Sequence, residues 1–261
     1  MRRPDQDETS VAQTCDAAGM PAEGGPAASL ADVCAGRAAV YEVLTYGFSE
    51  PNAAYVEALV SGEIMALLRD AVGWLDAGAV AYEPALTILG EAALSMRAVG
   101  GARALRGLRV DHARLFTGPG RPAVMCYASE YLDAGEGVTG RLNTCAADAA
   151  EAAYRAEGVS HSAAGGDLPD RVTTELEFLY HLCRREEAAR AKDDSDEATR
   201  LRRSLDAFLR GHAGLWLSRF AASVRALAEQ GVYVAMAELL IAHLTVEVGH
   251  GAESAMAGRG K

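Results

Sequence analysis

The chain has 261 residues, enough for one large or two small domains, and half of these residues are hydrophobic. Its 36 acidic residues outnumber its 25 lysines and arginines, so the formal net charge is −11 at pH 7. This charge argues against nucleic acid or an anionic membrane as the main partner, and it fits a basic peptide or a basic protein segment better.

Neither a membrane span nor a secretory leader is predicted. No run of about 18 apolar residues occurs, and the arginine pair of the opening M-R-R-P has no apolar stretch behind it. The five cysteines are scattered without a C-x-x-C pair. That pattern favours reduced thiols in a cytoplasmic protein over a disulfide framework or a zinc site.

The first part of the chain predicts a tail followed by helices. Residues 1–28 have hardly any large apolar side chain, so we expect a disordered tail there. Ser29 or Asp32 can cap a first helix, which the sequence S-E-P-N over 49–52 breaks. The further helices expected here cover 53–60, 62–72, 84–99 (opened by Pro84) and 102–116.

The helix over 102–116 leads into D-H-A-R-L-F-T-G-P-G at residues 111–120. Leu115 and Phe116 are expected to face the core, and the Gly-Pro-Gly sequence stops the helix. A loop with a short ordered piece at 125–127 follows. Beyond it we expect an alanine-rich helix over about 138–157 and a mobile loop over 158–168.

Residues 168–183 read L-P-D-R-V-T-T-E-L-E-F-L-Y-H-L-C and predict the helix around which the chain is organised. Pro169 fits the first turn of a helix, and the Asp170 carboxylate suits the positive end of the helix dipole. Glu175 falls at the edge of the apolar stripe, so its carboxylate is either solvated or paired with a cation from elsewhere. On periodicity alone, an ordinary helix with an acidic first turn is the preferred interpretation.

The last third of the chain also has a helical pattern. Charges alternate in sign over 184–203, which indicates a solvated surface with a turn near Asp193. Two further apolar-faced helices lead to a last one over 232–248. That helix is apolar nearly all round, so we expect it to be central.

The predicted fold class is all-α. No stretch shows the sustained alternation of apolar and polar residues that a strand with one buried face needs. We expect a single-domain bundle of about ten helices over 29–248, with a flexible C-terminal tail over 249–261.

No set of residues has the spacing of a catalytic or metal site. The six histidines form neither H-E-x-x-H nor H-x-x-x-H. The sequences G-x-S-x-G, G-x-G-x-x-G and the P-loop are absent as well. His243, inside the apolar last helix, is expected to be a core histidine.

Two segments together resemble the TorD/DmsD family of redox-enzyme maturation chaperones, and the resemblance covers about residues 30–248. The first segment is the helix end R-L-F-x-G-P-G, which contains Arg114, Leu115, Phe116, Gly118 and Pro119. The second, some fifty residues later, is P-D-x-x-x-x-E-L-x-F, which starts at Pro169 and Asp170. The sequence A-S-E-Y over 128–131 and the sequence F-L-x-x-H-x-x-x-W-L over 208–217 add support.

The resemblance implies an all-helical cytoplasmic chaperone with no cofactor and no catalytic activity. Its partner would be the apo form of a molybdenum-containing oxidoreductase catalytic subunit, held for cofactor insertion, assembly and export. The subunit's twin-arginine leader is a second candidate ligand. The residues expected to bind client or leader are Asp170, Arg171, Glu130, Tyr131 and Glu175, with the 158–168 loop as a gate.

Two positions depart from the family pattern. The family usually has E-Y before x-R-L-F, where this chain has Asp111 and His112, and it usually has His after Pro-Asp, where this chain has Arg171. A cation at position 171 would repel an arginine pair. A different client, or a weaker contact with the leader, is therefore an open alternative.

Arg114 carries a structural hypothesis of its own. A cation in an apolar helix end and a carboxylate near an apolar stripe each need a partner. We therefore expect Arg114 to form a largely buried ion pair with Glu175 or Glu177.

Two other classes of function stay open. One is a helical enzyme whose site the spacing does not reveal, and the other is a helical regulator or scaffold with a non-redox partner. A DNA-binding regulator would need a basic recognition helix, and the sequence has none. The oligomeric state is open between a monomer and a dimer that swaps helices across 118–137 or 158–168.

Overall fold

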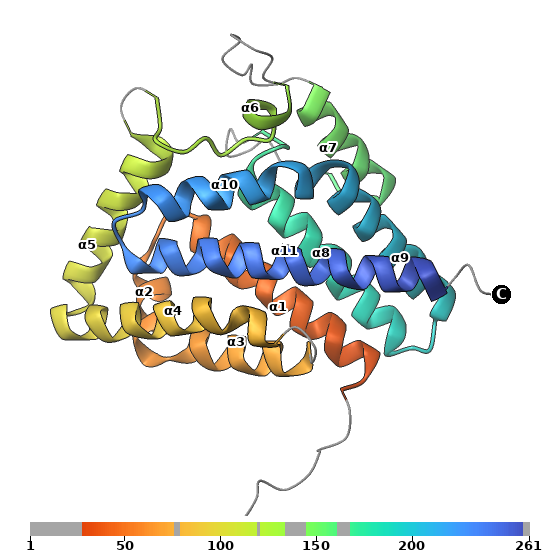
Figure 1. Cartoon of the computed structure of the whole chain (residues 1–261), viewed down its shortest axis with the longest axis horizontal. Coiled ribbons are helices and arrows are strands. Elements are labelled where there is room, and N and C mark those ends of the chain that lie inside the picture. Colours follow the sequence, from red (N-terminus) through yellow and green to blue (C-terminus); the bar gives the residue numbers. More distant parts are fainter. Residues whose placement is uncertain (1–27, 76–78, 119–120, 134–144, 161–167, 258–261) are drawn as a thin grey trace, which may run out of the picture.

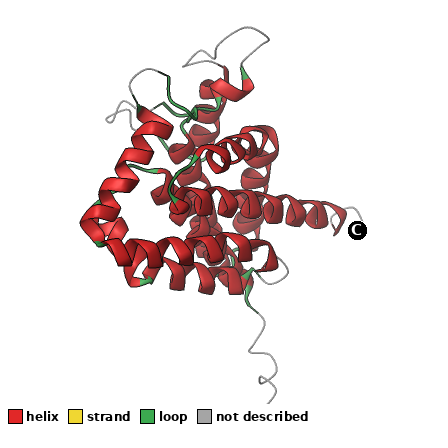
Figure 2. Cartoon of the chain, turned by 60° about the vertical axis from the view of Figure 1, so that its left-hand side comes forward, coloured by secondary structure: helices red, strands yellow, loops and turns green. Residues whose placement is uncertain are grey.

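The predicted all-α class is confirmed by the computed structural model, in which the described residues form eleven α-helices and two π-helical segments (Figure 1; Figure 2). Their one extended pairing is an isolated antiparallel bridge. The structure describes residues 28–75, 79–118, 121–133, 145–160 and 168–257, with the backbone alone for 248–257. The elements are α1 (Leu30–Phe48), α2 (Ala53–Ser61), α3 (Glu63–Trp74), α4 (Ala79–Val99), α5 (Gly101–His112), the π-helical η2 (Ala113–Thr117), α6 (Ser129–Leu132), α7 (Cys145–Ala156), α8 (Val172–Arg190), α9 (Ser195–Phe208), the π-helical η4 (Leu209–Ala213), α10 (Gly214–Leu227) and α11 (Gly231–Ala257).

Several helices begin at the capping residues that the sequence offers. The Ser29 hydroxyl accepts the Asp32 backbone N–H, and the Asp32 carboxylate accepts the Ser29 N–H at 2.8 Å, which completes a capping box. Asn52 caps α2 and Asp194 caps α9 through their side-chain oxygens. The first helix and the turn between α8 and α9 are therefore confirmed as predicted.

Three predicted helix boundaries are wrong. α4 already begins at Ala79, so Pro84 lies inside it, where its ring removes one backbone hydrogen bond. α8 begins at Val172 rather than at Pro169, and α11 continues past 248 to Ala257. The predictions for 1–27, 138–144 and 161–167 concern residues outside the described part of the chain.

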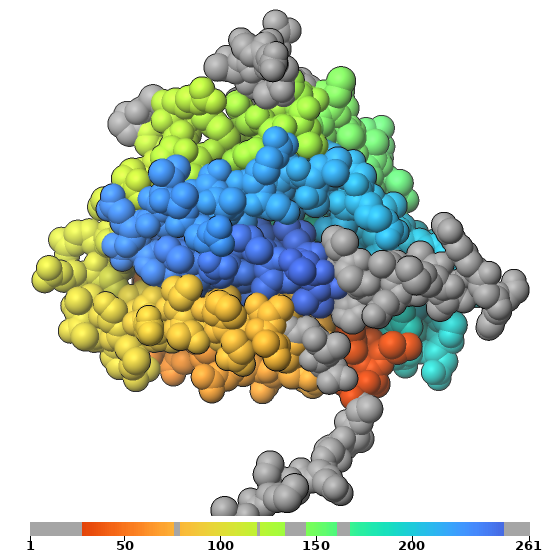
Figure 3. All heavy atoms as spheres, viewed as in Figure 1, coloured from red at the N-terminus to blue at the C-terminus, as the bar shows by residue number. Residues whose placement is uncertain are grey.

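The helices α1 and α11 form the centre of the molecule and contact each other. α1 packs along α8, while α11 lies between α4 and α10. Figure 3 shows α10 and α11 side by side across the middle of this face, with α4 below them. α1 approaches α3 so closely that a Cβ at Gly36 would lie 2.6 Å from the Ala71 carbonyl oxygen. Glycine is therefore required at position 36.

The buried hydrophobic side chains form one continuous cluster that reaches from α1 to α11. Its largest fully buried members include Trp216, Tyr41 and Tyr82. His243 is fully buried among them, with Nδ1 2.7 Å from the Tyr82 hydroxyl, so its prediction as a core histidine is confirmed.

The core also holds a charged network that the sequence did not indicate. The Arg37 guanidinium donates to both carboxylate oxygens of Glu247 and, at 3.1 Å, to Glu186. Arg190 donates to the other oxygen of Glu186 at 2.6 Å, and Arg202 lies 3.3 Å from Glu247. Arg37, Glu186 and Glu247 are all buried. The network thus links α1, α8, α9 and α11.

The prediction of a solvated surface over 184–203 is therefore wrong at Glu186, because that face of α8 packs against α1. Charge alternation alone does not distinguish a solvated helix from one whose charges meet partners on a neighbouring helix. Burial tends to raise the pKa of the Glu247 carboxyl, but the charges of Arg37 and Arg202 outweigh burial and lower the pKa to about 2.

We expect Glu247→Gln to lower the free energy of unfolding by about 3–5 kcal/mol, because removing one side of a buried ion pair leaves the other charges uncompensated. Urea denaturation at pH 7 measures this loss. Glu238→Gln is the matched control on the same helix, because it removes only a partly exposed pair with Arg225 and should cost less than about 1 kcal/mol. Equal losses of unfolding free energy in the two variants would contradict the proposed contribution of the buried network to stability.

The same carboxylate predicts an acid dependence of stability. Its pKa is lower in the folded chain than the ordinary value of 4.5, so it contributes fully above that value and loses its contribution as the pH falls toward 2. The difference in unfolding free energy between the wild type and Glu247→Gln should therefore narrow as the pH is lowered from about 5 to about 2. A difference that stays constant over this range would show that Glu247 is not ionised in the core.

Candidate functional site

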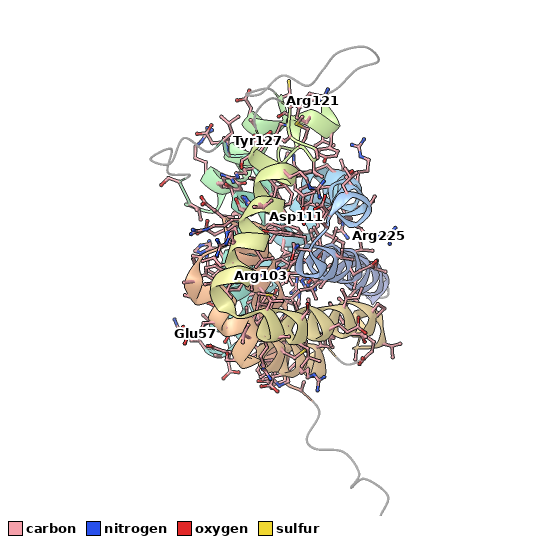
Figure 4. The ribbon with its side chains drawn as sticks, turned by 90° about the vertical axis from the view of Figure 1, so that its left-hand side faces the viewer. Glu57, Arg103, Asp111, Arg121, Tyr127 and Arg225 are labelled. Atoms are coloured by element: carbon pink, nitrogen blue, oxygen red, sulfur yellow. The ribbon has the colours of Figure 1, made fainter. Side chains whose placement is uncertain are left out.

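The loop that follows the first motif lies beside the start of the second motif, at the end of the molecule that holds α6, where Figure 4 labels Arg121 and Tyr127. The Val172 N–H donates to the Cys126 carbonyl at 2.8 Å, and the Ala128 N–H donates to the Asp170 carbonyl at 2.9 Å. These bonds flank the bridge between Tyr127 and Arg171. The loop after the first motif is thereby fixed to the start of the second.

Asp170 holds α6 rather than its own helix. Its carboxylate is buried and accepts the Ser129 backbone N–H at 2.9 Å. The N-cap of α8 is Arg171, which has extended backbone angles and no side-chain capping bond. The expected place of Pro169 and Asp170 in the first helical turn is therefore wrong, because these two residues form a turn before the helix, and Arg171, which pairs with Tyr127, has extended backbone angles.

Two polar atoms at this junction have no hydrogen-bond partner among the described residues. They are Asp170 Oδ1 and the Ser129 hydroxyl, and both are buried. The neighbouring Pro169 carbonyl accepts the Tyr154 hydroxyl at 2.6 Å, which ties α7 to the same place. The junction thus joins three segments and keeps unused hydrogen-bonding capacity.

Glu175 is fully buried and joins α8 to η4 and α10. His212 Nε2 lies 2.8 Å from one carboxylate oxygen, and the Trp216 indole N–H donates to the other at 2.9 Å. Burial raises the pKa of Glu175, and the bonds from His212 and Trp216 oppose this rise. The alternative of a solvated carboxylate is therefore wrong, and the partners of Glu175 are an imidazole and a neutral indole N–H.

Arg114 does not contact Glu175 or Glu177, so the predicted ion pair is wrong. Its guanidinium lies 2.6 Å from Asp111 and 3.2 Å from Glu229, and its side chain is 36% exposed. The reason lies in helical spacing: Arg114 follows Asp111 by three residues and shares its face, turned toward the start of α11. Asp111 also accepts the backbone N–H groups of Glu229 and Gln230 at 2.9 and 2.8 Å.

The rest of the first motif is structural. Leu115 and Phe116 are buried as predicted, and Phe116 stacks on Phe220 with ring centroids 6.1 Å apart. A Cβ at Gly118 would lie 2.9 Å from the Ala113 carbonyl oxygen, so the tight end of η2 favours glycine. Pro119, the last member of the motif, lies outside the described residues.

Glu130, Tyr131 and Arg171 are the members of the predicted set that reach the surface in part. Glu130 is 12% exposed in its side chain and lies 3.9 Å from the exposed Arg121. The Tyr131 ring packs on Trp216 with centroids 5.4 Å apart, and its hydroxyl donates to the Met125 carbonyl. Asp170 and Glu175, in contrast, are buried, so they can only position the residues that a partner touches.

Several residues of this arrangement were not singled out from the sequence. His212 and Trp216 appeared only within a supporting motif, although their i, i+4 spacing places them on one helix face. Arg219 was missed entirely; its guanidinium donates to the Tyr131 carbonyl at 2.6 Å and covers the Tyr131 ring. A lone arginine in an amphipathic helix gives no sign of such a contact.

Other site chemistry is limited within the described part of the chain. No cluster of three or more metal-binding side chains occurs there, and no helix there has the length and apolar character that crossing a bilayer needs. The described cysteines, Cys34, Cys126, Cys145 and Cys183, form no disulfide with one another. His212 also lines a cavity of about 340 Å³ with Phe178 and Phe208, but the carboxylate behind it is fully buried.

A comparison with protein-family models matches residues 79–222, more than half of the chain, to the nitrate reductase delta subunit family. The matched part contains both motif segments and His212 and Trp216. No curated protein matches the chain, and no solved structure matches it.

We expect Trp216→Phe to lower the free energy of unfolding by about 1–3 kcal/mol, because one oxygen of the buried Glu175 loses its donor. Thermal and urea denaturation measure the loss. Trp74→Phe is the control, since Trp74, the other tryptophan, is partly exposed on α3. A Trp216→Phe variant as stable as Trp74→Phe would show that the indole N–H does not support Glu175.

Proposed function

Since the chain belongs to the nitrate reductase delta subunit family, which is a chaperone family of the TorD/DmsD type, we propose that it binds the apo form of a molybdenum-containing oxidoreductase catalytic subunit. It would hold this client in the cytoplasm, without catalysis of its own, for cofactor insertion, assembly and export. The match over 79–222 is the observation that carries the proposal.

The geometry supports this function because the two motifs form one built unit. Backbone bonds fix the 126–128 segment to Asp170 and Val172, and the buried Glu175 joins this unit to α10. A surface held in this way is preorganised, which reduces the entropy that binding costs. We place the client-binding surface here, with Glu130, Tyr131 and Arg171 as the residues that touch the client.

In this proposal Asp170 is a positioning residue. Its buried carboxylate accepts the Ser129 N–H and thereby sets the position of Glu130 and Tyr131. Asp170 Oδ1 and the Ser129 hydroxyl have no hydrogen-bond partner among the described residues. A movement of α6 that brings polar groups of the client to these two atoms would therefore be favourable. Client binding would then change the positions of the surface residues and the hydrogen bonds of this buried pair at the same time.

The charge balance favours a basic client segment such as a twin-arginine leader. The chain carries a net charge of −11, and opposite charge speeds encounter and improves specificity. Glu130 supplies a carboxylate at the surface, whereas Arg171 repels a cation close by. The leader is therefore expected to approach from the Glu130 side of α6.

The experiment is an affinity purification from cells grown under conditions that induce molybdenum enzymes, with bound proteins identified by mass spectrometry. Wild-type protein should recover a molybdenum oxidoreductase subunit. Glu130→Lys should recover several-fold less at low salt, because it reverses the charge that meets the basic segment. Because the Glu130 side chain is only 12% exposed, Glu130→Gln is measured beside it: this variant keeps the shape of the side chain, loses only a long ion pair with Arg121, and should leave the melting temperature nearly unchanged.

Glu151→Lys on α7 is the matched control. It reverses a carboxylate that has a similarly long ion pair, 3.8 Å from Arg155, but that is 53% exposed and is not among the residues proposed to touch the client. It should recover as much client as the wild type. Repeated recovery of no molybdenum oxidoreductase by the wild type would refute the proposed function, and equal recovery by both variants would refute the placement of the site.

A further inference from the structure

A second surface feature lies on α5, away from the junction of the motifs. A cleft of about 690 Å³ runs between the end of α4, one face of α5 and the turn that leads into α11. Figure 4 looks onto α5 and shows Arg103 toward the opposite end of the helix from Arg121 and Tyr127. This cleft is therefore distinct from the proposed client surface around α6.

One helix face supplies most of the cleft. Arg103, Arg106, Gly107 and Val110 all line it, and their spacing of three, four and seven residues places them on one side of α5. Gly107 has no side chain, so the cleft extends to Gln230, whose amide oxygen would lie 3.6 Å from a Cβ at this position.

The cleft combines apolar and cationic groups. Val99 and Val110 are 47% and 64% exposed on its rim, and the flexible Met96 side chain lies buried in its lining. Arg103 and Arg106 are exposed, and no carboxylate of the described residues lies within ion-pairing distance of either. Exposed apolar side chains beside unpaired arginines are typical of an interaction surface.

The carboxylates of the cleft do not compensate these arginines. Asp111 is buried and bound by Arg114 and by two backbone N–H groups. Glu229 lies 3.2 Å from the same Arg114 guanidinium. The negative charge is therefore gathered at the Arg114 end, and the Arg103 end stays positive on a chain with a net charge of −11.

We propose that this cleft binds an acidic, apolar segment of the client, with carboxylates on Arg103 and Arg106 and apolar side chains on Val99, Met96 and Val110. The inference rests on the proposed function, and it adds a second point of contact that differs in charge from the first. A basic leader would be repelled by Arg103 and Arg106, whereas an amphipathic helix with an acidic edge fits both the groove and its charge.

The probe is a fluorescein-labelled amphipathic peptide with leucines on one face and glutamates beside them. The same peptide with lysines in place of the glutamates is its counterpart. Fluorescence anisotropy with the full chain should show binding of the acidic peptide, weakened by added salt. The lysine peptide should bind at least tenfold more weakly.

The double variant Arg103→Glu/Arg106→Glu should weaken acidic-peptide binding at least tenfold. Arg203→Glu on α9 is the control, since Arg203 is also exposed without an ion pair to a described residue, and it should leave binding unchanged. Position 103 lies in the first turn of α5, where glutamate suits the helix dipole, and position 106 is exposed, so the double variant is expected to fold. If the glutamate double variant does not fold, Arg103→Gln/Arg106→Gln removes the same two charges and should also weaken binding of the acidic peptide.

Equal affinity for the two peptides, no binding of the acidic one, or an unchanged affinity in the glutamine double variant would overturn the inference. The affinity purification separates this failure from that of the proposed function. If the wild type recovers a molybdenum oxidoreductase but the acidic peptide does not bind, only the role of the cleft is wrong. If the peptide binds as expected but no oxidoreductase is recovered, the cleft takes an acidic segment and the client is misassigned.

Discussion

The fold depends on the ion pair between Arg37 and Glu247 in the centre of the molecule. Arg37 uses three nitrogens to bind Glu247 and Glu186, so α1 is joined to α8 and α11 by charge as well as by apolar packing. A buried charge without a partner is costly, and alternative packings of these helices would separate the partners. The network therefore favours one arrangement of apolar helices that could otherwise slide along each other.

Other buried carboxylates, closer to the surface, also fix the positions of the segments that they bind. Asp111 fixes the start of α11, Asp170 fixes α6, and Glu175 fixes His212 and Trp216. Each accepts bonds from a segment distant in the sequence, so each converts a loop or a helix end into a defined position. Both motifs of the family thereby act mainly beneath the surface, and the residues available to a client are those that these carboxylates hold in place.

The two proposed contact surfaces differ in their charged groups. The end with α6 offers Glu130 beside Arg121, whereas α5 presents Arg103 and Arg106 without partners among the described residues. A client that carries a basic segment and a separate acidic one would meet complementary charge at both places. Two weak contacts on one rigid body can together bind more strongly than either alone when the client can span them.

The sequence by itself determined the helical class, most helix boundaries, the buried Leu115 and Phe116, and the family, because these follow from periodicity, capping and motif spacing. It did not determine the partners of the charged residues. Arg114 turned toward Asp111, Glu175 found His212 and Trp216, and Asp170 held α6 instead of its own helix. Helical periodicity places a side chain on a face but not opposite a particular group. Which distant carboxylate, amide or guanidinium meets it is decided only when the helices pack.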